Sequence, residues 1–330
     1  MKILAFESSC DETAVSVVED GRRVLANAVN SQVEIHRVHG GVVPEIASRN
    51  HIKNILPLTV AALEAAGMTL ADVDAVAVTN GAGLVGALLV GVSAAKALAY
   101  ALNVPLVAVS HIRAHVAANY ITYPELEPPF TALVVSGGHT MIAEQRSHTE
   151  LDVIRETADD AAGEAFDKVA RVLGYPYPGG ALVDKNATGR DDIEFFKHAK
   201  IIREGSFSYS GLKTAAVNYI HNKRMKGEPL NEPDICASFT RYALEPLIKA
   251  AVGQAGANAH KRLVLAGGVA ANSYLRRRLN EECAAANIAL YMPELKYCAD
   301  NAAMVGSLAY YYARAGIFAD LTLNAEPGLN

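Results

Sequence analysis

Residues 3–18 read ILAFESSCDETAVSVV, an apolar run, a short polar segment and a second apolar run. Residues 130–143 read FTALVVSGGHTMIA and repeat this arrangement with serine and glycine in the polar segment. Two apolar runs joined by a tight polar turn predict a β-hairpin, and the N–H groups and hydroxyls at its tip can bind an anion. Ordinary hairpins would explain either stretch by itself. The pair predicts two similar lobes that hold one phosphate-bearing ligand between them.

Length and composition favour a two-domain cytoplasmic protein. The 330 residues, 51% of them hydrophobic, exceed the roughly 250–300 residues at which a single core stops growing. A net charge of −5 is not that of a basic nucleic-acid-binding domain, although a local patch or a partner can supply phosphate contacts. The longest stretch with few charges, residues 81–95, is too short to span a membrane. The cysteines form no C-x-x-C pair, which fits a reducing compartment: Cys10, Cys236, Cys283 and Cys298.

Hydrophobic periodicity divides the chain into two α/β halves joined by a proline-rich linker at 123–129. The first half is predicted to contain strands at 3–6, 14–19, 23–28, 74–79 and 104–109, and helices at about 46–66, 84–102 and 111–119. The second half is predicted to contain strands at 130–135, 140–144, 151–156, 261–266 and 289–292, and helices at about 161–173, 211–223, 234–255 and 272–286. A polar insert with few apolar anchors occupies about 174–210, and a last helix at about 301–315 is expected to pack back on the first half.

The repeated order of a hairpin followed by helices is that of the RNase H-like unit, which is duplicated in the actin-like ATPase (ASKHA) fold. By this analogy we expect an N-terminal lobe at 1–123, completed by the last helix within about 301–330. The C-terminal lobe is expected at 124–300 and includes the insert at about 174–210. The ligand cleft is expected between the two lobes.

A candidate metal site begins with two histidines. His111 and His115 are spaced as i and i+4 on a predicted helix, so both rings project from one face. They can bind one divalent ion if a carboxylate completes the site, and Asp300 is the candidate. The alternatives are surface or core histidines and an N-cap aspartate. Zinc-protease motifs need a glutamate beside one histidine, but Ile112 and Ala114 occupy those positions, so peptidase chemistry lacks its base.

A glycine-rich segment at 81–86, GAGLVG, matches the dinucleotide-binding pattern between a strand and a helix. That fingerprint also needs an acidic residue at the end of the next strand, but the strand ends in Ser110 and His111. A tight turn and close helix packing explain these glycines at least as well.

Two further polar groups are candidates for chemistry. Asp11 and Glu12, at the first hairpin tip, can orient a metal-bound water or accept a proton, although acids are also common in turns. Gly267 and Gly268 follow a predicted strand and would let a planar base approach the backbone. Asn272 can hydrogen-bond such a base, and a plain helix N-cap is the alternative.

Ordered segments along nearly the whole chain resemble the tRNA N6-adenosine threonylcarbamoyltransferases of the bacterial TsaD type, a family formerly described as O-sialoglycoprotein endopeptidases. The segments are FESSCDET, SQVEIHRVHGGVVPEIASRNH, GLVGALLVG, the histidine pair, VVSGGHT, DDAAGEAFDKVARVLG, YPGG, FSYSGLKTA, AGGVAANSYLR and CADNAAM. The resemblance implies metal-dependent transfer of threonylcarbamoyl from threonylcarbamoyl-AMP to N6 of the adenosine 3′ to the anticodon. The tRNAs are those that read codons starting with A, and the product is t6A.

The resemblance also implies roles for individual residues. His111, His115 and Asp300 match the family's ligands for one divalent metal, usually iron and otherwise zinc. Asp11 matches an acid that acts in catalysis. The substrate-binding positions, which ATP-type nucleotides can also occupy, correspond to Val134, Val135, Ser136, Gly137, Gly138, Asp167, Gly180, Asp184 and Asn272.

The implied partners are tRNA, a paralogous non-catalytic subunit (TsaB type) and a small ATPase (TsaE type), with no membrane. A helix face of small residues, Gly86, Gly91, Ala94 and Ala95, is a candidate contact with these proteins, and its alternative is intramolecular packing. Two other functions remain open, a metallopeptidase and a sugar kinase or chaperone-like ATPase of the same fold. The ATPases carry Asp-x-Gly-Thr in their first loop, where this chain has Glu-Ser-Ser-Cys at 7–10.

Overall fold

The computed structural model describes residues 1–187 and 192–329, which form two compact units. Unit 1 consists of Met1–Pro128, Arg146–Leu151 and Pro293–Asn330. Unit 2 consists of Pro129–Gln145 and Asp152–Met292. Each unit is built on its own mixed β-sheet, as the alternation of strands and helices in the sequence predicts.

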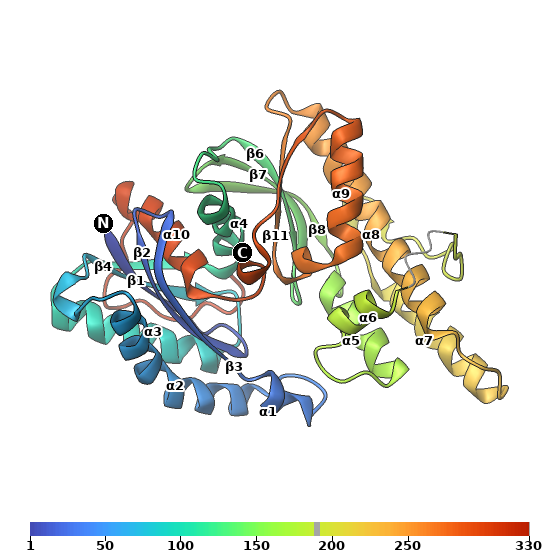
Figure 1. Cartoon of the computed structure of the whole chain (residues 1–330), viewed down its shortest axis with the longest axis horizontal. Helices are drawn as coiled ribbons and strands as arrows, with labels where there is room; N and C mark the ends of the chain where they lie inside the picture. Colours follow the sequence, from blue (N-terminus) through green and yellow to red (C-terminus); the bar gives the residue numbers. More distant parts are fainter. Residues whose placement is uncertain (188–191, 330) are drawn as a thin grey trace. The chain divides into compact units, whose positions relative to one another are not determined.

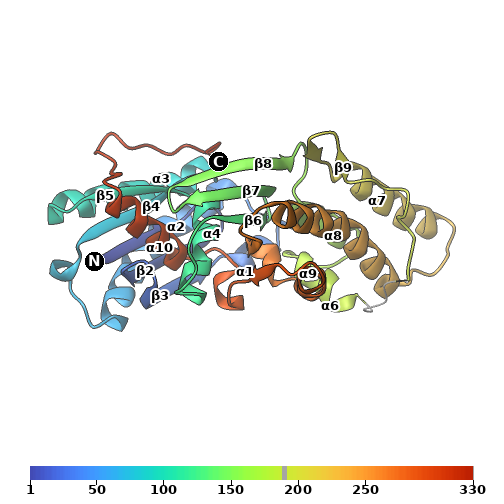
Figure 2. The same ribbon diagram turned by 90° about the horizontal axis from the view of Figure 1, so that it is seen from above.

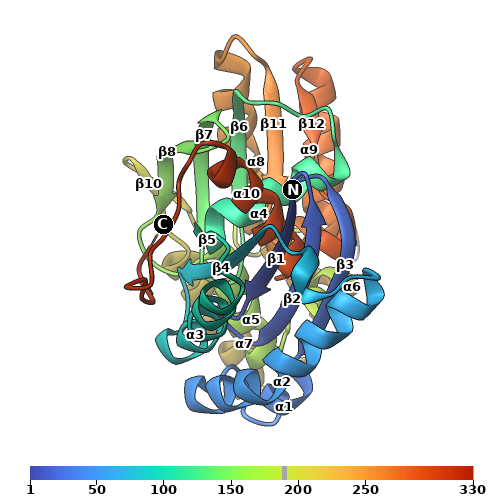
Figure 3. The same ribbon diagram turned by 90° about the vertical axis from the view of Figure 1, so that its left-hand side faces the viewer.

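The sheet of unit 1 has five strands in the order β3-β2-β1-β4-β5 (Figure 3). The strands are β1 (Lys2–Glu7), β2 (Glu12–Glu19), β3 (Arg23–Ser31), β4 (Ala75–Gly81) and β5 (Leu106–Ser110). Strands β1, β2 and β3 are antiparallel to one another, whereas β1, β4 and β5 run parallel. The carboxyl ends of three parallel strands therefore meet at one edge, where α/β sheets commonly bind ligands.

Helices cover both faces of this sheet (Figure 1). The helices α2 (Pro44–Ala65) and α3 (Val85–Leu102) pack on one face, and α4 (His111–Thr122) and α10 (Ala302–Arg314) pack on the other. Alternate residues of each strand point to opposite faces, so Leu4 and Phe6 join the core beneath α2 and α3. Gly306 brings α10 so close that a Cβ there would lie 2.7 Å from Val18.

Helix α3 corrects the expectation that the apolar stretch at 81–95 is too short to span a membrane. The helix continues to Leu102 and contains a single charge, Lys96, so its length and composition would allow it to cross a membrane. In the structure it packs on β4 and α2. The Lys96 ammonium donates to the Leu323 carbonyl, 3.0 Å away, which ties the helix to the C-terminal segment of unit 1.

The small-residue face of α3 is used inside unit 1. A Cβ on Gly86 would lie 2.5 Å from Oγ of Ser48, and one on Gly91 would lie 2.5 Å from Oγ of Ser8. Ala95 is fully buried in the same core. Gly91 and Ala95 of this face are therefore used for packing inside unit 1, whereas Gly86 and Ala94 remain partly exposed.

The sheet of unit 2 has the order β12-β11-β6-β7-β8-β10-β9, and β6, β7 and β8 lie side by side in Figure 2. Its strands are β6 (Phe130–Val135), β7 (Thr140–Ser147), β8 (Glu150–Thr157), β9 (Ile202–Arg203), β10 (Ser206–Phe207), β11 (Arg262–Ala266) and β12 (Ala289–Tyr291). Its helices are α5 (Ala162–Leu173), α6 (Gly180–Asn186), α7 (Ser210–Met225), α8 (Glu232–Ala257) and α9 (Ser273–Ala285). Helix α8 packs on β6 and β11, and α9 packs on α8 and β12.

Both predicted hairpins are present, but the insert at 174–210 is better anchored than expected. In the hairpins Glu7 pairs with Ala14 and Val135 with Thr140. The insert contains α6, β9 and β10, and its buried side chains include Ile193, Phe196, Ile201 and Phe207. Residues 188–191 of the insert lie outside the described residues. Local periodicity also missed α1 (Val33–Arg37) and the 3₁₀ turns at Leu70–Asp72, Gly268–Ala271 and Leu295–Tyr297, because segments this short carry little periodic signal.

Candidate metal centre and substrate loops

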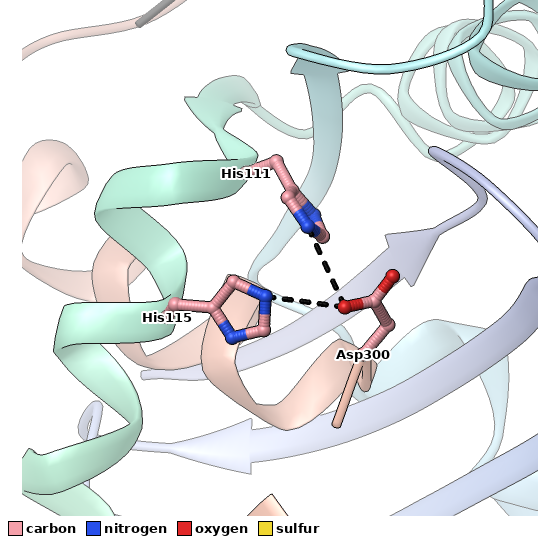
Figure 4. A group of neighbouring side chains, drawn as sticks. All are labelled: His111, His115 and Asp300. Carbon is pink, nitrogen blue, oxygen red and sulfur yellow. Dashed lines mark hydrogen bonds and ion pairs between the residues drawn. The ribbon is translucent and has the colours of Figure 1, made fainter. Parts of the chain in front are cut away.

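The two histidines of the candidate metal centre open helix α4, directly after strand β5. His111 and His115 are one helical turn apart and both are buried. Asp300 arrives from a segment far away in the sequence, just before α10. The N-cap of α10 is Asn301, whose side chain accepts from the Met304 N–H at 3.0 Å. The N-cap interpretation of Asp300 is therefore wrong, and its carboxylate points to the histidines instead (Figure 4).

The spacing of these three side chains suits one metal ion. Nε2 of His115 lies 3.1 Å from Oδ1 of Asp300, and Nε2 of His111 lies 3.5 Å from the same oxygen. The possible ligand atoms of all three residues are within 4.8 Å of one another. Donors about 2.1 Å from a tetrahedral ion lie roughly 3.4 Å apart. The residues therefore fit an ion such as zinc or iron(II), for which two imidazoles and one carboxylate are a known ligand set.

Negative charge gathers around this group. Burial lowers the pKa of His111, but the carboxylates of Asp300 and Glu7 outweigh burial and raise it to about 9. Burial raises the pKa of Asp300, but His111 and His115 lower it below its ordinary value. The pKa of Glu12 is raised to about 9 by burial and by the nearby charges of Asp300 and Asp11. The raised pKa of Glu12 shows that its carboxyl is disfavoured as an anion beside the carboxylates of Asp300 and Asp11, and a cation bound here would offset this repulsion.

The first hairpin tip contributes the predicted catalytic acid. Asp11 is buried, and its backbone carbonyl accepts from the Gln32 N–H at 2.9 Å. Burial and the Asp11 carboxylate raise the pKa of the neighbouring Cys10 thiol above its ordinary value. A thiol held in its neutral form is a poor nucleophile, so the surroundings of Cys10 do not favour it as a nucleophile.

Glu7 is the residue of this site that the sequence analysis missed. It ends β1, its carboxylate is fully buried, and Oε2 lies 3.2 Å from Nδ1 of His111. The available signal was an acid at the end of a strand whose preceding residues, Ile3 to Phe6, are all apolar. A buried carboxylate needs hydrogen-bond donors or positive charges that offset its lost hydration. An acid at this position therefore predicts that such partners lie around it in the fold.

The second hairpin tip forms an exposed loop in unit 2. Val134 and Val135 end β6, and the Ser136 N–H donates to the His139 carbonyl at 2.8 Å across the turn. Gly137 and Gly138 are exposed, and a Cβ on either would meet nothing within 4 Å. The backbone at the tip is therefore open to a ligand, as an anion-binding loop requires.

The remaining predicted substrate residues of unit 2 meet at helix α6. Oδ1 of Asp167 accepts from the N–H groups of Gly179 and Gly180, at 2.8 and 2.9 Å. The Asp184 carboxylate accepts from the N–H and the hydroxyl of Ser273, at 2.9 and 2.8 Å. The adjacent Asn272 is the N-cap of α9, and its side chain accepts from the Leu275 N–H at 2.9 Å. These carboxylates thus hold α6 between α5 and the start of α9.

The GAGLVG segment is covered by the C-terminal segment of unit 1. The Gly83 N–H donates to the Pro327 carbonyl at 3.2 Å, and the Glu326 N–H donates to the Asn80 carbonyl at 2.7 Å. A Cβ on Gly83 would lie 2.5 Å from the Ser9 carbonyl oxygen. These glycines serve close packing. This is the alternative to dinucleotide binding, and the absence of an acidic residue at the end of the next strand already favoured it.

Comparison with solved structures defines the class of protein first. Component A of the (R)-2-hydroxyglutaryl-CoA dehydratase of Acidaminococcus fermentans is 16% identical, with a TM-score of 0.59 over 95% of this chain and 99% of that chain. A ROK family protein from Streptococcus pneumoniae is 9% identical, with a TM-score of 0.54 over 96% and 99% of the two chains. These similarities concern the fold alone, and they confirm the predicted actin-like (ASKHA) fold.

Comparison of sequences then defines the family. The profile described as tRNA N6-adenosine threonylcarbamoyltransferase matches residues 23–307. A relative of that name from Moorella thermoacetica is 50% identical over 99% of this chain and 96% of its own length. Another, from Caldicellulosiruptor bescii, is 46% identical over 100% of this chain and 98% of its own length. The chain belongs to the tRNA N6-adenosine threonylcarbamoyltransferase family, which confirms the resemblance inferred from the motifs.

Proposed function

We propose that this chain is a tRNA-modifying acyltransferase. It transfers the threonylcarbamoyl group of threonylcarbamoyl-AMP to N6 of the adenosine 3′ to the anticodon, in tRNAs that read codons starting with A, and forms t6A. The observation that carries this proposal is the match of the chain to this one family over nearly its full length. The peptidase alternative still lacks its base, because Ile112 and Ala114 stand where that motif needs glutamate.

The metal centre is assigned to His111, His115 and Asp300, whose spacing fits an iron or zinc ion. When such an ion is bound, it neutralises charge that develops on the phosphate leaving group. The buried acids near these residues stabilise positive charge in the site. The side chain of Asp300 keeps 22% of its surface exposed, so the centre remains accessible to a ligand.

Substrate binding is assigned to unit 2. The open backbone at 136–138 binds the phosphate, together with the end of β6 at Val134 and Val135. Asp167, Gly180 and Asn272, with Asp184 beside them, hold the nucleoside part. These assignments are supported by the exposed loop and by the hydrogen bonds of Asp167 and Asp184, which join α6 to α5 and to Ser273, the neighbour of Asn272.

The reaction needs no covalent intermediate on the enzyme. The N6 amine attacks the carbamoyl carbon, the bond from that carbon to the phosphate oxygen breaks, and AMP leaves with the electron pair. The amine loses one proton, and Asp11 is the proposed catalytic acid or base near this step. The high pKa of the Cys10 thiol agrees with a mechanism in which cysteine is not the nucleophile.

The proposal includes partners and a compartment. Units 1 and 2 are the two RNase H-like lobes, and the enzyme works in the cytoplasm with tRNA, a TsaB-type subunit and a TsaE-type ATPase. Unit 1 has an exposed apolar row for such a subunit, Ile52, Leu56 and Val60 of α2, which are spaced as i, i+4 and i+8. Residues at this spacing share one helix face.

The test combines product analysis with one substitution. Metal-loaded protein is mixed with threonylcarbamoyl-AMP and unmodified tRNA, with and without the partner proteins, and the digested nucleosides are analysed by mass spectrometry. We expect threonylcarbamoyl-adenosine from the wild type and none from His111→Ala, while the exposed α7 variant His221→Ala remains active. A fully active His111→Ala would refute the metal role. Absence of product in both conditions, with ATP turnover without tRNA, would support the ATPase alternative instead.

A further inference from the structure

We infer that Glu7 is a positioning residue that fixes the ring of His111 for metal binding. This inference rests on the proposed metal centre. The two ring nitrogens of His111 have different carboxylate neighbours. Oε2 of Glu7 is 3.2 Å from Nδ1, whereas Oδ1 of Asp300 is near Nε2. Nε2, which faces Asp300, is the nitrogen available to an ion. Metal-binding histidines commonly donate their second N–H to a carboxylate, which fixes both tautomer and ring orientation.

The position of Glu7 follows from the strand order of unit 1. Strands β1, β4 and β5 are parallel, so Glu7, Thr79 and the start of α4 reach the same edge of the sheet. Oε1 of Glu7 accepts from the Ser9 N–H at 2.6 Å, and Oε2 accepts from the Thr79 hydroxyl at 2.6 Å. With His111 as third donor, the buried carboxylate has a partner on each oxygen. Each donor supports the ionised form, so Glu7 remains a fixed acceptor for Nδ1–H.

The two histidines are not supported equally. Oγ of Ser9 also lies 3.2 Å from Nδ1 of His111, so this nitrogen has two neighbours. In the part of the chain that the structure describes, no hydrogen-bond partner reaches the buried Nδ1 of His115. Because metal binding needs a neutral imidazole with a lone pair on the ligating nitrogen, a defined tautomer matters. Glu7 holds the proton on Nδ1 of His111, so the proton displaced by an ion is the one on Nε2.

The substitution Glu7→Gln reverses this preference without changing the shape of the side chain. Its oxygen must still face the Ser9 N–H, so its NH₂ group faces Nδ1 of His111 and donates to it. The proton of the neutral ring then favours Nε2, so an ion can bind there only after the proton has moved back to Nδ1. Loss of such a second partner typically lowers metal affinity about 10- to 100-fold, and we expect a loss of this size.

A matched control exists in unit 2. The Glu144 carboxylate accepts from His260, Asn258 and Thr131, at 2.6, 2.8 and 3.2 Å, and therefore also has three donors including one imidazole. Glu144→Gln removes the same kind of pair in the unit that does not contain the metal centre. We expect it to leave zinc affinity unchanged, and Glu7→Asp, which keeps the charge, to retain more affinity than Glu7→Gln.

The experiment measures zinc affinity of the full chain by competition with a chromophoric chelator, with circular dichroism and thermal unfolding to verify that each variant is folded. The ¹⁵N shifts of His111 in the zinc-loaded wild type give a second readout that needs no variant. A proton on Nδ1, together with an affinity loss that is largest in Glu7→Gln and absent in Glu144→Gln, supports the inference. Equal affinity of folded Glu7→Gln and wild type, or a proton on Nε2, overturns it. If the wild type binds no zinc, both the metal centre and the role of Glu7 are refuted. The transferase activity is tested independently by the product analysis described above.

Discussion

The substitution Gly163→Ala tests whether the loop at 136–138 is held in place by the first turn of α5. A Cβ on Gly163 would lie 2.7 Å from the Ser136 carbonyl oxygen, 2.9 Å from Cα of Gly137 and 3.0 Å from its nitrogen. Ordinary contacts begin at about 3.4 Å, so the loop must move by roughly 0.4–0.7 Å. Overpacking of this kind costs about 1–3 kcal/mol, and the better helix propensity of alanine offsets up to about 1 kcal/mol.

The consequence for function is larger than the consequence for folding. One hydrogen bond to a charged group contributes about 1.5–3 kcal/mol, and about 1.4 kcal/mol corresponds to a factor of ten. If the displaced loop loses one N–H contact with the phosphate, affinity for threonylcarbamoyl-AMP falls roughly 10- to 100-fold. Zinc affinity stays the same, because the metal centre belongs to unit 1.

The assay is calorimetric titration of threonylcarbamoyl-AMP and of zinc into each variant. The control is Gly253→Ala on an exposed face of α8, where a Cβ meets nothing within 4 Å. We expect this control to bind both ligands normally and to gain about 0.5–1 kcal/mol in stability. If Gly163→Ala is as stable as wild type and binds the adenylate equally well, then close packing against Gly163 does not set the loop.

Two further predictions concern stability and the C-terminal segment. Burial raises the pKa of Asp160, but hydrogen bonds from Lys168 and Lys213 outweigh burial and lower it below its ordinary value. The ionised Asp160 therefore stabilises the fold fully above the pKa of the unfolded chain, near 4. This stabilisation is lost as pH falls through the lower pKa of the folded state. Because Lys168 is partly exposed, we expect Asp160→Asn to lower the free energy of unfolding by about 1–2 kcal/mol at pH 7, a difference that shrinks toward zero in acid. Urea unfolding at pH 7 and pH 3 measures it, and an equal difference at both would contradict the assignment. Separately, a Cβ on Gly81 would overlap the Glu326 carbonyl, so Gly81→Ala should release the C-terminal segment and speed its proteolysis; unchanged cleavage would show that this contact does not hold it.

Much of the fold could be predicted because its signals are local. Alternating apolar residues within a strand and the i, i+4 spacing of His111 and His115 involve neighbours along one element. The hairpins, the principal helices and the histidine pair were found in this way. The short elements of the insert were not, because their apolar residues, such as Phe196 and Phe207, are buried by partners distant in sequence.

The sequence by itself determined the order of strands and helices, the family and the types of residue that can bind a metal or a phosphate. The tertiary structure alone decided which of those residues meet. Asp300 and His115 are 185 positions apart in the sequence. They meet because α10, which follows Asp300, packs against α4, which carries His115. Glu7 reaches His111 because parallel pairing brings the ends of β1, β4 and β5 to one edge. Such contacts depend on packing between residues that are distant in the sequence, so local hydrophobic periodicity cannot predict them.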